Sequence, residues 1–182
     1  MAIYACSDLH GRLDLLEQIQ SFLNHDDKVY FLGDAGDRGS YPWESIKRIA
    51  QDNRFIYLKG NHEDMLVQAM GDEVRNEGHG VLGKNFALLS QNGGGETFLH
   101  WLLEPMKTGW WSYLKKLPTY EKYVNEQGSR FIFATLVLIQ CRMALSLMTM
   151  ICFGIDAIGT LRNLFLMIKK SACMVILLFH IY

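Results

Sequence analysis

The sequence has little of what marks several common classes of protein. It has no excess of basic residues, because 18 Lys and Arg stand against 19 Asp and Glu, and the formal net charge is -1. Proteins that bind nucleic acids collect phosphates through a basic field, so we expect no nucleic-acid partner. The four cysteines form no CxxC pair, which gives no sign of a zinc ribbon or a dithiol redox site.

The N-terminal stretch "MAIYACSDLHG" lacks the charged lead and the long apolar run of a secretory signal. Together with the unpaired cysteines, this favours a reduced, cytoplasmic setting. The length of 182 residues fits one domain with a real hydrophobic core.

The last third of the chain is short of acids and of proline. Residues 128–182 contain one acid, Asp156, and none of the three prolines, but they hold three of the four cysteines. The preceding residues mix acids, bases and apolar side chains in the manner of a soluble globular domain. We therefore predict a domain over residues 1–133 and an apolar tail of non-native appearance over residues 134–182.

Apolar periodicity predicts alternating strands and helices near the N-terminus. Short apolar runs at residues 2–6, 28–33 and 54–60 are typical of buried strands, and a segment with helical spacing follows each of them. This order predicts a largely parallel α/β sheet. A β-hairpin is predicted over residues 119–133.

Three polar motifs come directly after these strands: DLHG at residues 8–11, GDAGDRG at 33–39 and GNHE at 60–63. Each alone could be an ordinary loop or helix cap. All three end a predicted parallel strand, however, and ligands of such sheets collect at the carboxyl ends of the strands. The three motifs should therefore converge on one site.

The residue types in these motifs suit metal binding. Asp8 and His10 flank a single residue, so both side chains can point to the same side, and carboxylate with imidazole suits Zn, Mn or Fe. In the second motif, glycines allow a tight turn around Asp34 and Asp37, with Arg38 beside them.

The set DxHG, GDxxDRG and GNHE, in this order, resembles the calcineurin-like metallophosphoesterase superfamily, and within it the serine/threonine protein phosphatase branch. The resemblance covers about residues 2–70, and NGGG at 92–95 is similar to a looser element of bacterial and phage members. It implies an αββα sandwich, of which this chain would hold the incomplete N-terminal part, and two divalent metal ions.

Carried over to this sequence, the resemblance implies that Asp8 and His10 hold one ion, that Asp34 bridges both ions and that Asn61 binds the second. Two such ions generate a nucleophilic hydroxide near neutral pH and clamp the phosphoryl oxygens. Mn, Fe and Zn remain open as the identity of the ions.

The resemblance also implies three catalytic residues. His62 would protonate the leaving group as a general acid, Asp37 would orient His62, and Arg38 would bind phosphate oxygens through its planar fork. For Glu63 we expect no more than support of a helix start. The implied substrates are phosphorylated proteins or small phosphoesters.

Two further motifs of the family are missing from the sequence. A HAG-like motif should follow the predicted hairpin, and a GHT-like motif should come later, each with a histidine ligand for the second ion, but the tail contains neither. We expect a metal-dependent phosphomonoesterase by family, with impaired catalysis in this chain. The alternatives are a dinucleoside tetraphosphatase-like hydrolase and an inactive truncated product.

A shift of the reading frame explains both the missing motif and the change in composition. Codons that can encode Ala134 to Gln140 give His-Ala-Gly when they are read one base earlier. Loss of a single T near Phe133 would create this offset. We therefore predict that residues 134–182 are an out-of-frame product.

Membrane insertion is the alternative interpretation of the tail. Residues 131–155 approach the roughly 20 apolar residues that span a bilayer. Arg142 lies near the middle, where an arginine costs about 2.5–3.5 kcal/mol on insertion scales. We therefore expect no membrane anchor.

Overall fold

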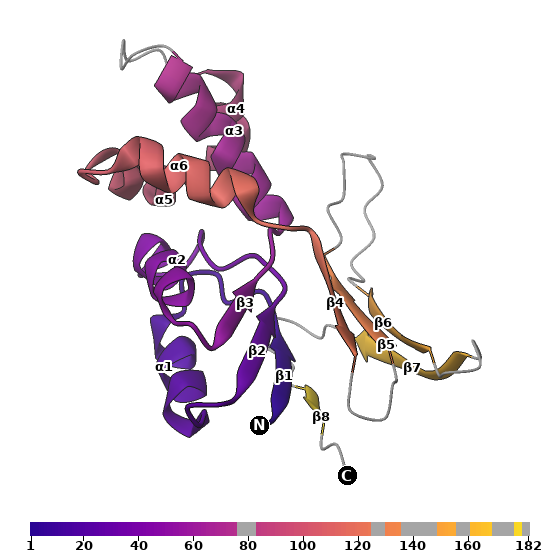
Figure 1. Ribbon diagram of the computed structural model, residues 1–182. Helices are drawn as coiled ribbons and strands as arrows, with labels where there is room; N and C mark the ends of the chain where they lie inside the picture. The colour runs from indigo at the N-terminus through magenta and orange to yellow at the C-terminus, as the bar shows by residue number, and fades with distance from the viewer. Residues whose placement is uncertain (76–82, 125–129, 136–148, 156–160, 169–176, 180–182) are drawn as a thin grey trace.

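A computed structural model describes the chain in six segments (Figure 1). The described residues are 1–75, 83–124, 130–135, 149–155, 161–168 and 177–179.

The first sheet contains the strands that the apolar runs predict. Strands β1 (Ile3–Cys6), β2 (Lys28–Phe31) and β3 (Phe55–Tyr57) are parallel and adjacent, in the order β3-β2-β1. The prediction of a largely parallel sheet is therefore confirmed. A short strand from the tail, β8 (Leu177–Phe179), pairs antiparallel with the outer edge of β1.

Helices α1 (Leu13–Phe22) and α2 (Pro42–Gln51) lie along one face of this sheet (Figure 1). Pro42 stands at the first position of α2, where its missing N–H costs no hydrogen bond. Both helices turn an apolar stripe toward the sheet, because Leu16 and Ile46 are almost completely buried in one cluster with Phe31. Burying such side chains stabilises the fold by about 1.5–3 kcal/mol each.

Four helices gather at the top of the view in Figure 1, beyond the sheet. They are α3 (Asn61–Arg75), α4 (Lys84–Gln91), α5 (Gly95–Leu102) and α6 (Lys107–Lys116). Trp101 of α5 and Leu114 of α6 are fully buried in the same cluster as Met70 of α3. The helical group is thus continuous with the core and fixes the start of α3 above the first sheet.

The second sheet begins with the predicted hairpin. Strands β4 (Tyr120–Val124) and β5 (Arg130–Ala134) pair antiparallel, and the predicted turn between them lies outside the described residues. Strands β6 (Thr149–Ile155) and β7 (Leu161–Ile168) continue the sheet in the order β4-β5-β6-β7.

The two sheets pack against each other through a separate hydrophobic cluster. Its buried members include Ile3, Tyr30 and Leu58 from the first sheet and its loops, and Phe133 from the second. The rings of Tyr30 and Phe133 stack with their centroids 3.9 Å apart, a contact that adds about 0.5–1.5 kcal/mol to the burial of their area. The described part thus contains a helical layer and two sheets, which is the predicted incomplete sandwich.

Part of the alternative membrane span can be compared with the structure. Residues 130–134 and 149–155 form strands, and residues 136–148 lie outside the described part. Among the described helices, none combines the length and the apolar character that crossing a bilayer requires.

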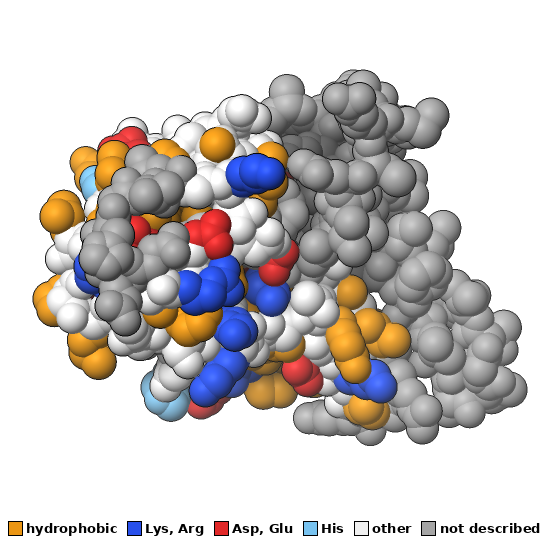
Figure 2. Space-filling model, turned by 90° about the horizontal axis from the view of Figure 1, so that it is seen from above, with side chains coloured by type: hydrophobic (Ala, Val, Ile, Leu, Met, Phe, Trp, Pro, Cys, Tyr) orange, Lys and Arg blue, Asp and Glu red, His pale blue; other side chains and the backbone are white. Residues whose placement is uncertain are grey.

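Charges of both signs are mixed on the face seen from above. Lys and Arg side chains gather in the middle of the described surface in this view, with Asp and Glu side chains beside them (Figure 2).

Candidate active site

Backbone hydrogen bonds fasten the loop after β1 to the loop after β2. The N–H of Asp8 donates to the carbonyl of Gly33 (3.1 Å), and the N–H of His10 donates to the carbonyl of Asp34 (3.0 Å). These bonds extend the parallel pairing of the two strands beyond their ends. The first two polar motifs therefore lie side by side at the carboxyl end of the sheet, as the sequence predicts.

Two glycines are required because the motif backbones almost touch. A Cβ atom on Gly33, whose φ is +89°, would lie 2.3 Å from the backbone nitrogen of Gly60. A Cβ atom on Gly39 would lie 2.2 Å from the carbonyl oxygen of His10. Any side chain at these positions would force the loops apart, so the glycines of the motifs keep the three loops in contact.

Several residues of the motifs adopt the left-handed conformation, which side chains normally disfavour. Among the described residues, the non-glycine positions with positive φ all belong to the first two motifs: Asp8 (58°), His10 (46°), Asp34 (62°), Asp37 (66°) and Arg38 (62°). Such positions cost about 1–3 kcal/mol each and concentrate at functional sites. The left-handed backbone conformation at these positions thus sets the directions of their side chains.

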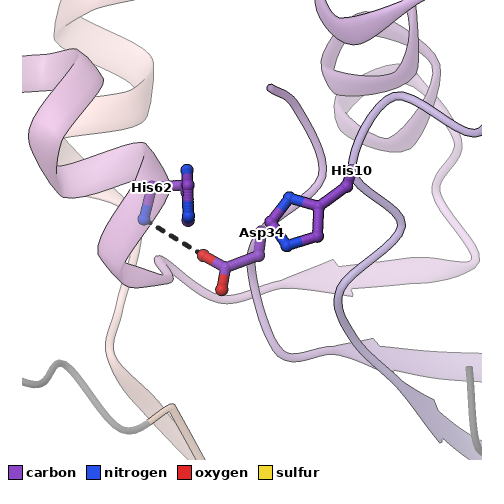
Figure 3. A group of neighbouring side chains, drawn as sticks. All are labelled: His10, Asp34 and His62. Atoms are coloured by element: carbon purple, nitrogen blue, oxygen red, sulfur yellow. Dashed lines mark hydrogen bonds between the residues drawn. The ribbon is translucent and has the colours of Figure 1, made fainter. Parts of the chain in front are cut away.

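His10, Asp34 and His62 form a group with metal-binding geometry. One ligand atom from each lies within 4.8 Å of the others, and Figure 3 shows the three side chains facing one another. The backbone N–H of His62 donates to Oδ1 of Asp34 (3.0 Å; Figure 3). The Nδ1 atom of His10 donates to the carbonyl of Gly36 (3.1 Å), which leaves the Nε2 lone pair facing the site.

The protonation of this group favours a cation. Burial, reinforced by the charges of Arg38 and His62, lowers the pKa of His10 to about 4, so its imidazole is neutral at pH 7. Burial and the nearby charge of Glu63 raise the pKa of Asp34 to about 7, because its negative charge lacks compensation. A divalent ion would supply that compensation, and neutral imidazole with carboxylate is a suitable donor set.

His62 has a different environment, although its ring centroid lies only 4.9 Å from that of His10. Its Nδ1 donates to Oδ2 of Asp37 at 2.6 Å, and both side chains are buried. Burial alone would lower the pKa of His62, but the hydrogen bond to Asp37 and the charge of Asp34 outweigh it, and the pKa is raised. The predicted pairing of Asp37 with His62 is therefore present in the structure.

Arg38 reaches over both imidazoles from the edge of the site. Its Nη1 lies 3.2 Å from Nε2 of His10, and its Nη2 lies 2.9 Å from Nε2 of His62. The side chain is exposed, so the guanidinium can meet a ligand that arrives from solvent. A planar fork in this place suits phosphate oxygens.

The remaining two predicted ligands are Asp8 and Asn61. Asp8 Oδ1 is 3.8 Å from Nε2 of His10, and Asp8 Oδ2 accepts a hydrogen bond from the Ser7 hydroxyl (2.6 Å). Asn61 is the first residue of α3, directly before His62. The three motifs therefore converge, with His10, Asp34 and His62 at the centre of the site.

Glu63 does more than the sequence indicates. It lies in the first turn of α3, as expected, but its side chain is buried and joins two motif loops. Oε2 accepts hydrogen bonds from the backbone N–H groups of Asp34 and Gly60, and Oε1 accepts from the N–H of Ala35 and from the Tyr57 hydroxyl, all at 2.8 Å. Its main role is therefore to hold the second motif against the third.

Thr97 is a site neighbour that the sequence reasoning missed. It is fully buried, and its hydroxyl donates to Oδ1 of Asp37 at 2.5 Å. The signal that could have found it is the glycine run at residues 92–95, since an unusual turn directly before a helix often brings the backbone close to a site.

Comparison with protein families gives a match over most of the chain. The family model for calcineurin-like phosphoesterases matches residues 1–132. No curated protein matches the chain.

Three solved structures are similar to parts of the chain. The chain is 23% identical to a metallophosphoesterase from Sphaerobacter thermophilus, with a TM-score of 0.46 over 70% of this chain and 44% of the other. The chain is 17% identical to a candidate diadenosine tetraphosphatase, with a TM-score of 0.43 over 65% of this chain and 44% of the other. It is 27% identical to a serine/threonine phosphatase from Saccharomyces cerevisiae with similarity to human phosphatase PP5. That match has a TM-score of 0.30 over 50% of this chain and 32% of the other. The chain thus spans less than half the length of each of these proteins.

Proposed function

Because the chain belongs to the family of calcineurin-like phosphoesterases, we propose that it derives from a metal-dependent phosphatase that hydrolyses phosphate monoesters, with phosphorylated serine and threonine of proteins as substrates. Members of this family are hydrolases that use divalent metals. One observation carries the proposal: His10, Asp34 and His62 bring ligand atoms within 4.8 Å of one another, and Asp37 holds Nδ1 of His62. The pKa values of the two imidazoles, which are shifted in opposite directions, support it, since a site of this kind needs one neutral ligand and one proton donor.

The proposed ligands are Asp8 and His10 for one ion, Asp34 between two ions and Asn61 for the second. When bound, the ions would lower the pKa of a water molecule and neutralise charge on the phosphoryl oxygens. The neutral imidazole of His10 and the uncompensated carboxylate of Asp34 support this assignment. Mn, Fe and Zn all suit this mixture of nitrogen and oxygen donors.

The proposed general acid is His62. Asp37 fixes Nδ1 of its ring, so Nε2 is the atom that can give a proton to a departing alkoxide. Asp37 is the partner of Nδ1, and Nε2 lies 2.9 Å from Nη2 of Arg38, a donor from which Nε2 of the neutral ring can accept a hydrogen bond. Arg38 would bind the phosphate and stabilise the charge that grows on its oxygens.

The same proposal includes impaired catalysis in the chain as written. The HAG-like and GHT-like motifs are missing from residues 134–182, so the second ion would keep only Asp34 and Asn61 as ligands. The family match ends at residue 132, next to the change in composition, which supports a frame-shifted tail. The second candidate is therefore an inactive product that binds one ion.

Metal stoichiometry and phosphate release separate these candidates. The purified chain is loaded with Mn²⁺, its bound ions are counted, and release of phosphate from a phosphoserine peptide and from diadenosine tetraphosphate is measured. About two ions per chain and peptide turnover that His62→Ala abolishes would support the phosphatase. His100→Ala is the matched control, because His100 is exposed on α5. At most one ion and no turnover would support the inactive product, and turnover of the dinucleotide alone would support the tetraphosphatase.

Sequencing of the coding DNA across residues 131–140 tests the tail directly. If a T is missing near Phe133, the corrected chain should regain a His-Ala-Gly motif and a second ion. If the bases are correct as read and the source organism carries them, the chain is a decayed phosphatase.

A further inference from the structure

The start of helix α5 lies against Asp37, although the two are far apart in sequence. A Cβ atom on Gly94, which precedes the helix, would lie 2.6 Å from Oδ2 of Asp37 and 2.2 Å from a methyl carbon of Leu89. Only glycine leaves room for the carboxylate there. The positive end of the helix dipole thus faces an acidic side chain, which is a favourable arrangement.

Thr97, in the first turn of α5, contacts the same residue at two atoms. Its hydroxyl oxygen accepts a hydrogen bond from the backbone N–H of Asp37 (3.1 Å) and donates its proton to Oδ1 of the Asp37 carboxylate (2.5 Å). One hydroxyl therefore holds both the backbone and the side chain of Asp37, whose φ is +66°. A methyl group of the same size could make neither bond.

These contacts leave each carboxylate oxygen of Asp37 with a defined partner. Oδ1 binds Thr97, and Oδ2 accepts the hydrogen bond from Nδ1 of His62. Thr97 holds Oδ1 of the carboxylate, and a Cβ atom on Gly94 would lie 2.6 Å from Oδ2, so the glycine leaves the space that this oxygen needs. The orientation of the His62 ring is thus set by a residue that does not touch it.

The segment around Gly93 holds the neighbouring Arg38 in a similar way. The backbone N–H of Arg38 donates to the carbonyl of Gly93 (3.0 Å), and its Nε donates to the carbonyl of Asn92 (3.3 Å). A Cβ atom on Gly93, whose φ is +89°, would lie 2.8 Å from Cγ of Arg38. Residues 92–97 therefore contact both Asp37 and Arg38.

We propose that Thr97 is a positioning residue for the acid of this site: its hydroxyl fixes the Asp37 carboxylate, and through it holds the neutral His62 ring in the Nδ1–H form, with Nε2 turned toward Arg38. The catalytic meaning of this arrangement rests on the phosphatase function proposed above, but the arrangement itself does not. A buried threonine with an ordinary structural role would satisfy its hydroxyl locally, whereas this one bonds across 60 residues of sequence.

The test uses the full chain without metal or substrate, labelled with ¹⁵N at histidine. At alkaline pH, where the ring is neutral, two-bond nitrogen–proton correlations report which nitrogen of His62 carries the proton. We compare the wild type with Thr97→Val, which keeps the shape and removes the hydroxyl, and with Thr97→Ser, which restores it. Thr108→Val is the matched control, since Thr108 is exposed on α6.

The wild type should show a single Nδ1–H form with a slowly exchanging ring proton. Thr97→Val should give averaged nitrogen shifts and a ring proton lost to exchange, while Thr97→Ser and Thr108→Val keep the wild-type pattern. A wild-type ring that already averages, an unchanged Val variant, or a folded Ser variant that loses the pattern would each overturn the proposal. If the Val variant does not fold, Thr97→Ala, which also removes the hydroxyl, takes its place with the same expected result.

Phosphate release from a phosphoserine peptide is then measured on the same proteins after they are loaded with Mn²⁺. Absence of release in the wild type, together with the expected spectra, would support the inactive product described above and leave the positioning role intact. Phosphate release by the wild type, together with unchanged spectra in Thr97→Val, would support the phosphatase activity and refute the positioning role of Thr97.

Discussion

The two sides of the site contain the same residue type in opposite electrostatic states. On one side, the cation side (His10, Asp34 and Glu63), the Nδ1 of His10 donates to a neutral carbonyl and its pKa is lowered to about 4. On the other, the acid side (His62, Asp37, Thr97 and Arg38), the Nδ1 of His62 donates to a carboxylate and its pKa is raised. Burial lowers the pKa of both rings, and at His62 alone the hydrogen bond to Asp37 and the charge of Asp34 outweigh it.

The largest expected effect comes from disrupting the cation side through Glu63→Gln. An amide can accept at one of the two positions only. Its NH₂ group would face either the N–H groups of Asp34 and Gly60, or the N–H of Ala35 and the Tyr57 hydroxyl. Each buried polar group left without a partner costs about 1–3 kcal/mol, so we expect a loss of about 2–4 kcal/mol in the free energy of unfolding. Denaturant unfolding of the metal-free chain measures it. Glu73→Gln on the same helix is the control, and an equal loss there would contradict the role of Glu63.

Asp34→Asn should remove most of the ion affinity of the cation side. The carboxylate is the acidic member of the central group, and its uncompensated charge is what attracts a cation. Loss of an outer-sphere partner already lowers metal affinity 10–100-fold in other sites, so we expect a loss of more than about 100-fold here. Calorimetric titration with Mn²⁺ measures it, with Asp26→Asn as an exposed control. Binding within a few-fold of the wild type would exclude Asp34 as a ligand.

The pH dependence of stability should show opposite contributions from the two central groups. Asp34, whose pKa is raised from 3.8 to about 7, makes the metal-free fold less stable as pH rises through that window, because the unfolded chain ionises first. His10, whose pKa is lowered from 6.5 to about 4, makes the fold more stable as pH rises through its own window, because the unfolded chain holds the extra proton. The two contributions largely cancel in the wild type.

A variant that removes one of the two groups should therefore show how the other group alone makes the free energy of unfolding depend on pH. In metal-free protein, Asp34→Asn should gain stability from about pH 4 to 6.5 relative to the wild type, and His10→Asn should lose it from about pH 4 to 7. Unfolding by urea at several pH values measures both slopes. Parallel stability profiles for all three proteins would contradict the pKa shifts.

Asp37→Asn should shift the pKa of His62 in the same direction as that of His10. Without the carboxylate, the burial of His62 is no longer outweighed, so its pKa should change from raised to lowered. Titration of the His62 ring by NMR follows the change, while Asp14→Asn, at an exposed position, should leave it unaltered. A His62 pKa that stays raised in the variant would show that the charge of Asp34 alone sustains it.

The smallest expected effect is that of Arg38→Met. The side chain is exposed, so the free energy of unfolding should change by less than about 0.5 kcal/mol. The pKa of His10 should rise slightly, because one of the charges that lower it is removed, yet it should stay below its ordinary value, since burial is the larger cause. If the pKa of His10 returned to its ordinary value in this variant, Arg38 would be the main cause of the lowered pKa. That result would contradict the larger role given to burial.

The sequence predicts the part of this molecule that depends on local signals. The parallel strands and the convergence of Asp8, Asp34 and His62 follow from apolar runs that each end in a polar motif, because strand direction places those ends at one edge. The pairing of β8 with β1 was not predicted, since strand pairing over such a separation leaves no periodic trace in either segment.

The supporting residues were missed for a similar reason. Glu63 has a sufficient local explanation at a helix start, and only the folded chain shows that its side chain turns inward to meet Asp34 and Gly60. Thr97 contacts Asp37 only because the helical group folds over the sheet. Contacts of this kind depend on tertiary packing, which residue spacing does not encode.

The left-handed backbone of the motif residues has a kinetic consequence. Because these turns form with the fold and are held by the close approach of Gly33 and Gly60, the chain loses little further conformational entropy when an ion arrives. Ion exchange should then be limited by how quickly the ion sheds its water shell, with no slow phase of loop closure. The rate of metal uptake should therefore depend strongly on which ion binds. It should depend only weakly on solvent viscosity or on the temperature dependence of motions of the protein.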